Sequence, residues 1–225
     1  RLFTVAALVA IVAVVSQRAL GVASYEFGVE RDFTGVLVSD PVPTLLVARP
    51  GAQGGVSRYP LVAPFKFGAE ELVADHLDRL VTLTGSLAYR DDQTLIELLP
   101  DSIQPAEAGA PRPQTAPAES LGTHTLVGEI VDSKCFLGVM NPGSTRPHRA
   151  CATLCIQGGI PPVLLVRQAN GEATYLMLVD EEGRTVNAGV LGMIAEPVEI
   201  TGAVERHDDM LVLRAHPSSY TRLIR

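Results

Sequence analysis

The strongest constraint on the fold of this chain is an internal repeat. Residues 81–85 (VTLTG) resemble residues 198–202 (VEITG), and the same offset of 117 (198 minus 81) pairs Asp91-Asp92 with Asp208-Asp209. A constant offset over roughly twenty residues is typical of a duplicated structural unit. The repeated aspartate pairs predict two hairpin turns.

The two copies differ by an insertion. Residues 33–38 match residues 126–131 at an offset of 93, whereas residues 43–47 match residues 162–166 at an offset of 119. The second copy therefore carries 26 extra residues (119 minus 93) between its first and second strands. All three cysteines lie in these extra residues: Cys135, Cys151 and Cys155. Because the first copy lacks cysteine, the repeated fold does not require it.

Each copy predicts five strands with a short helix between the third and the fourth. In the first copy the strands are 33–38, 44–49, 60–66, 79–88 and 93–99, with a helix at 69–78. In the second copy they are 124–133, 162–168, 173–180, 197–205 and 210–215, with a helix at 187–195. This order is typical of an OB-type barrel. We therefore predict an all-β fold with small helices: tandem OB-like Greek-key barrels after an N-terminal transmembrane helix.

The predicted domains follow from the repeat and from a change in composition. Residues 104–120 are rich in proline and alanine without apolar periodicity, which predicts a linker. The predicted parts are an N-terminal transmembrane anchor or signal peptide at 1–24, an OB-like domain at 25–103, the linker at 104–120, and a second OB-like domain at 121–225 with the cysteine-containing insertion at 134–161.

The first residues form an uncharged apolar run from Leu2 to Val15. At ~1.5 Å per residue the run spans about 21 Å, short of the ~30 Å bilayer core, so length alone favours a cleaved signal peptide. The chain begins at Arg1, so the apolar run can extend further upstream, and we predict a retained anchor. Single-pass insertion in the bacterial cytoplasmic membrane, with Arg1 inside, places the domains on the periplasmic or extracytoplasmic side.

Charge and composition argue against nucleic-acid binding. The formal net charge is −7 and tryptophan is absent. A nucleic-acid groove needs a basic face, and single strands are bound on aromatic platforms. We also find no phosphate-binding loop, nucleophile elbow or Ser/His/Asp arrangement, so the chain is more consistent with a non-catalytic subunit than with an enzyme.

The insertion predicts one helix. Ser144 or Thr145 can cap it, Pro147 can start it, and Gly158-Gly159 can end it. His148, Cys151 and Cys155 are spaced i, i+3 and i+7, which places them on one face of such a helix.

Cys135 leaves the preceding strand and could meet that face. Together Cys135, His148, Cys151 and Cys155 are a sufficient ligand set for zinc, copper or an iron–sulfur cluster, although their spacing matches no standard motif. Two other interpretations stay open. Cys135 could form a disulfide with Cys151 or Cys155, leaving one free thiol, or the thiols could be reactive.

No Asp or Glu occurs between Ser133 and Gly171, whereas four basic residues do: Lys134, Arg146, Arg149 and Arg167. In an acidic protein such a stretch predicts a positive patch that binds an anionic partner. Ordinary solvated side chains are the alternative.

The motifs GEIVDSKC (128–135), PHRAC (147–151) and CIQGGIPP (155–162) resemble a family of bacterial membrane-anchored or exported proteins. The resemblance covers about 35 residues, and it implies proximity to membrane redox enzymes. We therefore predict a membrane-anchored, extracytoplasmic accessory subunit of a larger redox or electron-transfer complex. Its insertion would bind a metal or dock another subunit. The alternatives are a structural interaction module with a disulfide-braced insertion, and a thiol oxidoreductase.

Overall fold

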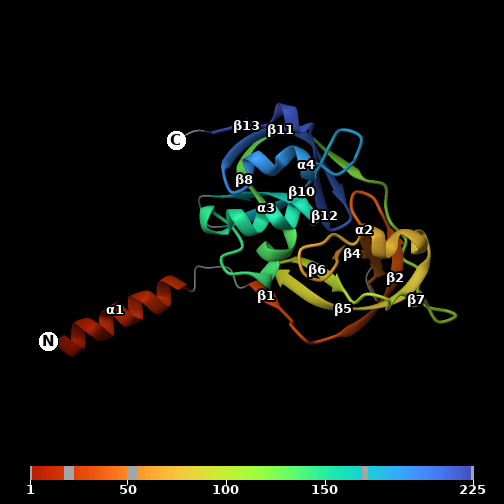
Figure 1. The fold of residues 1–225 in the computed structure, drawn as a ribbon, viewed down its shortest axis with the longest axis horizontal. Coiled ribbons are helices and arrows are strands. Elements are labelled where there is room, and N and C mark those ends of the chain that lie inside the picture. Colours follow the sequence, from red (N-terminus) through yellow and green to blue (C-terminus); the bar gives the residue numbers. More distant parts are fainter. Residues whose placement is uncertain (1, 18–22, 50–54, 169–171, 224–225) are drawn as a thin grey trace.

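A computed structural model of the chain describes residues 2–17, 23–49, 55–168 and 172–223. It contains two closed five-stranded barrels (Figure 1). The strands of the first barrel follow the order β5-β2-β3-β4-β6, and β6 pairs with β5 to close it. Their bounds are β2 (Arg31–Val38), β3 (Thr44–Ala48), β4 (Val56–Val62), β5 (Leu80–Arg90) and β6 (Gln93–Leu98).

The second barrel repeats this topology. Its strands follow the order β11-β8-β9-β10-β12, and β12 pairs with β11 to close it. Their bounds are β8 (Glu119–Asp132), β9 (Pro162–Arg167), β10 (Ala173–Val179), β11 (Pro197–His207) and β12 (Met210–Arg214). In both barrels the third and fifth strands are parallel and the other pairs are antiparallel. The predicted tandem barrels are confirmed.

The two copies share strand register as well as strand order. Gly35 pairs with Val81 in the first barrel, and Gly128 pairs with Val198 in the second. At both glycines a Cβ atom would overlap the backbone of the next strand, at the carbonyl oxygen of Leu46 or of Leu165. The repeated glycine thus allows two strands to approach closely at the same point of each barrel.

Short helices connect the third and fourth strands, as predicted. They are α2 (Glu70–Val73) with η1 (Ala74–His76) in the first copy, and α4 (Asn187–Val190) with η4 (Leu191–Met193) in the second. Other short elements were not predicted: β1 (Ala23–Tyr25), β7 (Gln104–Pro105), β13 (Thr221–Arg222) and η5 (Pro217–Ser219). β1 and β7 add to β5, and β13 adds to β11. The first two residues of the predicted linker lie in β7, and its last two lie in β8.

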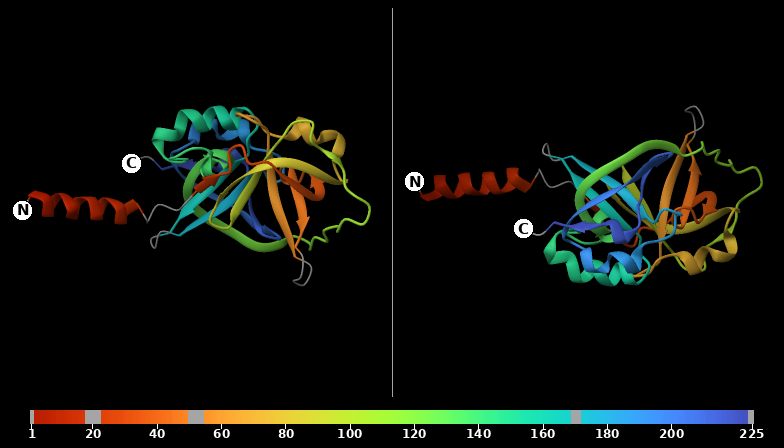
Figure 2. Two further views of the ribbon diagram at one scale, coloured as in Figure 1. Left: turned by 90° about the horizontal axis from the view of Figure 1, so that it is seen from below. Right: turned by 90° about the horizontal axis from the view of Figure 1, so that it is seen from above.

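The apolar N-terminal run forms helix α1 (Leu2–Gln17), which extends away from the barrels (Figures 1 and 2). Its 16 residues are fewer than the ~20 that usually cross a bilayer. Among the described helices, none is long and apolar enough to span a membrane. The N-terminal membrane anchor stays a prediction.

The insertion occupies residues 133–161, where the first barrel has only residues 39–43. It contains the helical turn η2 (Cys135–Val139), the turn η3 (Arg146–His148) and the helix α3 (Arg149–Gln157). η2 contacts β1, β5 and β6 of the first barrel, and α3 packs on β8, α4 and η4 of the second. The insertion therefore lies between the two barrels (Figure 1).

Each barrel has its own apolar interior, and a further core joins them. Val62 and Leu95 of the first barrel share this core with Phe136 and Leu137 of η2 and with Met177 of the second barrel. The ring of Phe136 stacks on that of Tyr175, with centroids 5.8 Å apart. The junction is thus a buried apolar interface, and the insertion supplies much of it.

Polar contacts continue the junction at the β11–β12 hairpin. The Arg58 Nε atom donates to Asp208 Oδ2 at 2.8 Å, and the Arg58 backbone N–H donates to Asp209 Oδ1 at 2.9 Å. Asp91 and Asp208 have φ values of 54° and 53°, so the repeated aspartates do form the predicted turns. In the second copy, Asp208 and Asp209 also bind Arg58 of the first barrel.

Gly138 tests the packing of the insertion on β1. Its φ is +150°, and a Cβ atom there would overlap the backbone of Ser24. We expect Gly138→Ala to lower the free energy of unfolding by about 1–3 kcal/mol, through backbone strain and displacement of β1. Urea denaturation measures the loss. Gly109→Ala is the matched control, because Gly109 also has positive φ but open space around it. An equal loss in both variants would contradict the proposed steric role.

Candidate metal centre

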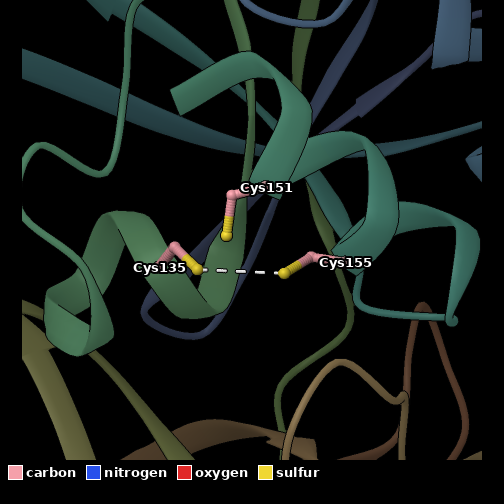
Figure 3. A group of neighbouring side chains, drawn as sticks. All are labelled: Cys135, Cys151 and Cys155. Atoms are coloured by element: carbon pink, nitrogen blue, oxygen red, sulfur yellow. Dashed lines mark hydrogen bonds between the residues drawn. The ribbon is translucent and has the colours of Figure 1, made fainter. Parts of the chain in front are cut away.

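The three cysteine sulfurs meet at the inter-barrel junction. Cys135 begins η2, and Cys151 and Cys155 lie one turn apart on α3. Their Sγ atoms all lie within 4.8 Å of one another, and the Sγ atoms of Cys135 and Cys155 are 3.8 Å apart. Figure 3 shows the three side chains pointing toward a common centre. Cys135 and Cys155 are buried, whereas Cys151 is half-buried.

All three cysteines are free thiols. The predicted disulfide is therefore wrong, because a bonded pair of sulfurs would be ~2.05 Å apart. The predicted convergence of Cys135 on the helix face is what the structure shows. The insertion is held to the barrels by packing and hydrogen bonds and does not need a disulfide.

Lys66, in the loop after β4 of the first barrel, also contacts the sulfurs. Its Nζ atom lies 2.9 Å from Cys151 Sγ and 3.5 Å from Cys155 Sγ. The loop that carries Lys66 follows β4, and the Gly68 N–H donates to the Gly158 carbonyl at 2.9 Å just after α3. The site is thus composite, with sulfur from the insertion and a positive charge from the first barrel.

The local environment shifts the pKa values of the two buried thiols, Cys135 and Cys155, in opposite directions. The pKa of Cys155 is lowered to about 7, first by the hydrogen bond from Cys135 and also by Lys66, against the opposing effect of burial. The pKa of Cys135 is raised, first because its thiol donates that hydrogen bond and then because it is buried. The hydrogen bond with Cys151 is the main cause that raises the pKa of Lys66. The cluster therefore favours one thiolate beside an ammonium group.

A second buried group adjoins the cluster through Cys135. The Asp132 carboxylate accepts a hydrogen bond from the Cys135 backbone N–H at 2.8 Å, and its other oxygen lies 3.0 Å from His148 Nε2. Asp132 and His148 are both buried. The side-chain ligand atoms of Asp132, His148 and Cys135 also lie within 4.8 Å of one another. This group holds the backbone at the start of η2, and so it positions Cys135.

The predicted four-ligand set thus divides into two overlapping groups. Cys135, Cys151 and Cys155 form the sulfur group, and His148 belongs to the group with Asp132. The reason is local geometry: His148 lies in η3 just before α3, so its ring does not follow the helix face of Cys151 and Cys155. Neither Ser144 nor Thr145 caps this helix with its side chain, contrary to the prediction.

Lys134 is not part of an exposed patch. Its side chain is 1% exposed, and Nζ donates to the carbonyl oxygens of Ala63 at 2.9 Å and Phe65 at 2.8 Å. It also forms an ion pair with Glu97, which accepts a further hydrogen bond from the Tyr25 hydroxyl at 2.7 Å. Lys134 therefore does not contribute to the predicted exposed patch, because it is buried against the first barrel of the same chain.

The three arginines of the predicted patch remain near the surface. Arg146 and Arg149 both pair with Glu196, which lies outside the acid-free stretch, and Arg167 donates to Ser144 Oγ at 3.0 Å. Glu196 therefore neutralises part of the positive charge that the sequence pattern indicated. Binding of an anionic partner by these arginines stays a prediction.

Two residues of the site were missed by sequence reasoning. Asp132 lies in the GEIVDSKC motif, and its spacing of three residues before Cys135 is typical of a carboxylate that accepts a backbone N–H. That signal was available. Lys66 had no such signal, because it lies 85 residues before Cys151 and in the other barrel.

Fold and site together define a class of protein: an all-β protein of two closed five-stranded barrels with a thiol cluster between them. A comparison with protein-family models finds none that matches this chain, and a comparison with curated proteins finds no significant match.

The Lys134–Glu97 pair tests how the junction is held together. We expect Lys134→Met to lower the free energy of unfolding by about 2–4 kcal/mol, since it leaves Glu97 and two carbonyl groups without their donor. Adding Glu97→Gln should recover part of this loss. Thermal and urea unfolding of both variants measure the difference. Equal stability of the single and double variants would show that the ion pair does not contribute.

The thiolate of Cys155 predicts a pH dependence of stability. A folded-state pKa lowered to about 7 stabilises the metal-free protein fully above the ordinary thiol pKa of 9.0, and this stabilisation is lost as pH falls through 7. Stability should therefore rise between about pH 7 and 9, and Cys155→Ser should remove that rise. Urea unfolding across this range measures it. An unchanged slope in the variant would assign the effect to other groups.

Proposed function

We propose that this chain binds one soft metal ion, zinc or copper(I), through Cys135, Cys151 and Cys155. The single observation that carries the proposal is the convergence of three unbonded sulfurs at the inter-barrel junction. Thiolate groups are the protein ligands that select such metals. In tetrahedral coordination at ~2.3 Å, two thiolates lie about 3.8 Å apart, which matches the Cys135–Cys155 separation of 3.8 Å.

The surroundings of the sulfurs support this proposal in two ways. A divalent ion with three thiolates carries a net charge of −1, and the Lys66 ammonium beside Cys151 would offset it. Asp132 accepts the backbone N–H of Cys135 and is itself in contact with His148. Such hydrogen-bonded groups next to the ligands commonly orient them in metal sites. Three protein ligands leave one position of a tetrahedral ion open to water or to a ligand from a partner.

The number of cysteines favours zinc or copper over an iron–sulfur cluster. A cubic or rhombic iron–sulfur cluster is normally held by four cysteines, and the chain has three. Zinc has no redox chemistry, so zinc would indicate a structural or docking role. Copper would suit the electron-transfer role that the sequence resemblance implies. We retain, as part of the proposal, a non-catalytic accessory role in a redox complex outside the cytoplasm.

Metal content tests the proposal directly. We expect the protein, purified without chelator, to carry about one equivalent of zinc or copper, or to take it up on titration. Cys135→Ser, Cys151→Ser and Cys155→Ser should each abolish most of the binding. His148→Ala should weaken it by about 10–100-fold, because it disturbs only the positioning of Cys135. Inductively coupled plasma mass spectrometry and competition with a chromogenic chelator measure content and affinity.

Thr153→Ala is the matched control, because Thr153 lies on α3 between the cysteines but points its hydroxyl to the Arg149 carbonyl. It should leave the metal affinity unchanged. Wild-type protein that stays folded and binds neither metal would contradict the proposal. The insertion would then be a bracing element alone, which is the structural alternative.

A further inference from the structure

Cys151 is the thiol of the cluster that solvent reaches. Cys135 and Cys155 are 3% and 1% exposed, whereas Cys151 is half-buried. Its neighbour Lys66 is also partly exposed and lies between two outward-facing rings, Phe65 and Phe67. A small oxidant such as a peroxide would therefore meet Cys151 before the other two thiols.

The Cys151 sulfur is in direct contact with the Lys66 nitrogen. The 2.9 Å separation from Lys66 Nζ equals the usual length of an N–H···O bond, although sulfur is the larger atom. Cys155 is poorly placed to form a disulfide with Cys151. Residues four apart on a helix have Cβ atoms about 5–6 Å apart, whereas a disulfide needs about 3.5–4.5 Å. Cys135 is engaged with Cys155 at 3.8 Å.

We propose that Lys66 and Cys151 form a covalent N–O–S link when a peroxide oxidises the metal-free site. This modification site does not rest on the proposed metal function. It requires only the contact between the two side chains and a peroxide as oxidant. Bound metal would protect the sulfurs, so the two properties are separable.

The chemistry balances with two peroxide molecules. The Cys151 sulfur attacks the first peroxide, an S–O bond forms, the O–O bond breaks, and the proton shared by Cys151 and Lys66 leaves with the released hydroxide as water. The second peroxide displaces water from the sulfenic acid, which gives a sulfur-bound hydroperoxide. The Lys66 amine then attacks the oxygen attached to sulfur, the O–O bond breaks, and the leaving hydroxide removes a proton from nitrogen as water.

Sulfur and nitrogen each lose two electrons in this sequence, and the two peroxides accept all four. Three of the four peroxide oxygen atoms leave as water, and the fourth becomes the bridging oxygen. The product joins the loop after β4 to helix α3, and so it joins the first barrel to the insertion of the second. The link would convert a docked interface into a covalent one. A thiol reductant would reverse it, because the sulfur is still at a reducible level.

Peptide mapping of the full chain tests the proposal. Chelator-treated wild-type protein is exposed to a small excess of hydrogen peroxide, alkylated and digested. We expect a linked pair of peptides that contain Lys66 and Cys151, heavier than their sum by one oxygen atom less two hydrogen atoms. Dithiothreitol should separate the pair. If the cysteines bind zinc, loading the protein with zinc before oxidation should reduce the yield of the linked pair.

Lys66→Arg is the control, because it keeps the positive charge but removes the primary amine. It should give no linked pair and should leave Cys151 as a sulfenic or sulfinic acid. A disulfide from Cys151 to Cys135 or Cys155 in the wild-type protein would overturn the proposal. So would stable sulfinic acid at Cys151 with Lys66 unmodified. The metal-binding proposal is judged separately, on protein that has not been oxidised.

Discussion

The buried ammonium group of Lys134 constrains how the two halves of this protein fit together. A charge removed from water is costly unless it is paired and hydrogen-bonded. Lys134 belongs to the second copy, yet its partners, Glu97 and the carbonyl groups of Ala63 and Phe65, all belong to the first. The group is therefore satisfied only when the barrels are docked in this arrangement. The apolar core between them adds the driving force, and Lys134 adds the requirement for one orientation.

The thiol cluster depends on this docking. Cys135 follows Lys134 directly, so the anchored lysine and the Asp132 carboxylate hold the start of η2 from both sides. The loop whose carbonyl groups bind Lys134 also carries Lys66, which contacts Cys151. Anything that changes the charge or bonding of the sulfurs must act on the same loop. Chemistry at the cysteines and docking of the barrels are thus coupled through a few residues.

The parts of the fold that sequence predicted are those with a local or repeated signal. Alternating apolar residues marked the barrel strands, and the duplication supplied a second test of each one. The two-residue and three-residue strands β1, β7 and β13 carried no usable periodicity. The predicted side-chain cap at Ser144 or Thr145 does not form. Thr145 adopts a positive φ of 67°, and helix α3 starts only after η3.

By itself, the sequence determined that this protein has two related barrels and that its cysteines lie in an insertion absent from the first. Both facts follow from comparing the sequence with itself, because a repeat and an insertion are properties of residue order. Only the tertiary structure decided that the cysteines are free thiols, that Lys134 is buried, and that Lys66 contacts the sulfurs. These features depend on how one barrel meets the other. Residues brought together by that contact are far apart along the chain, and no local pattern specifies their pairing.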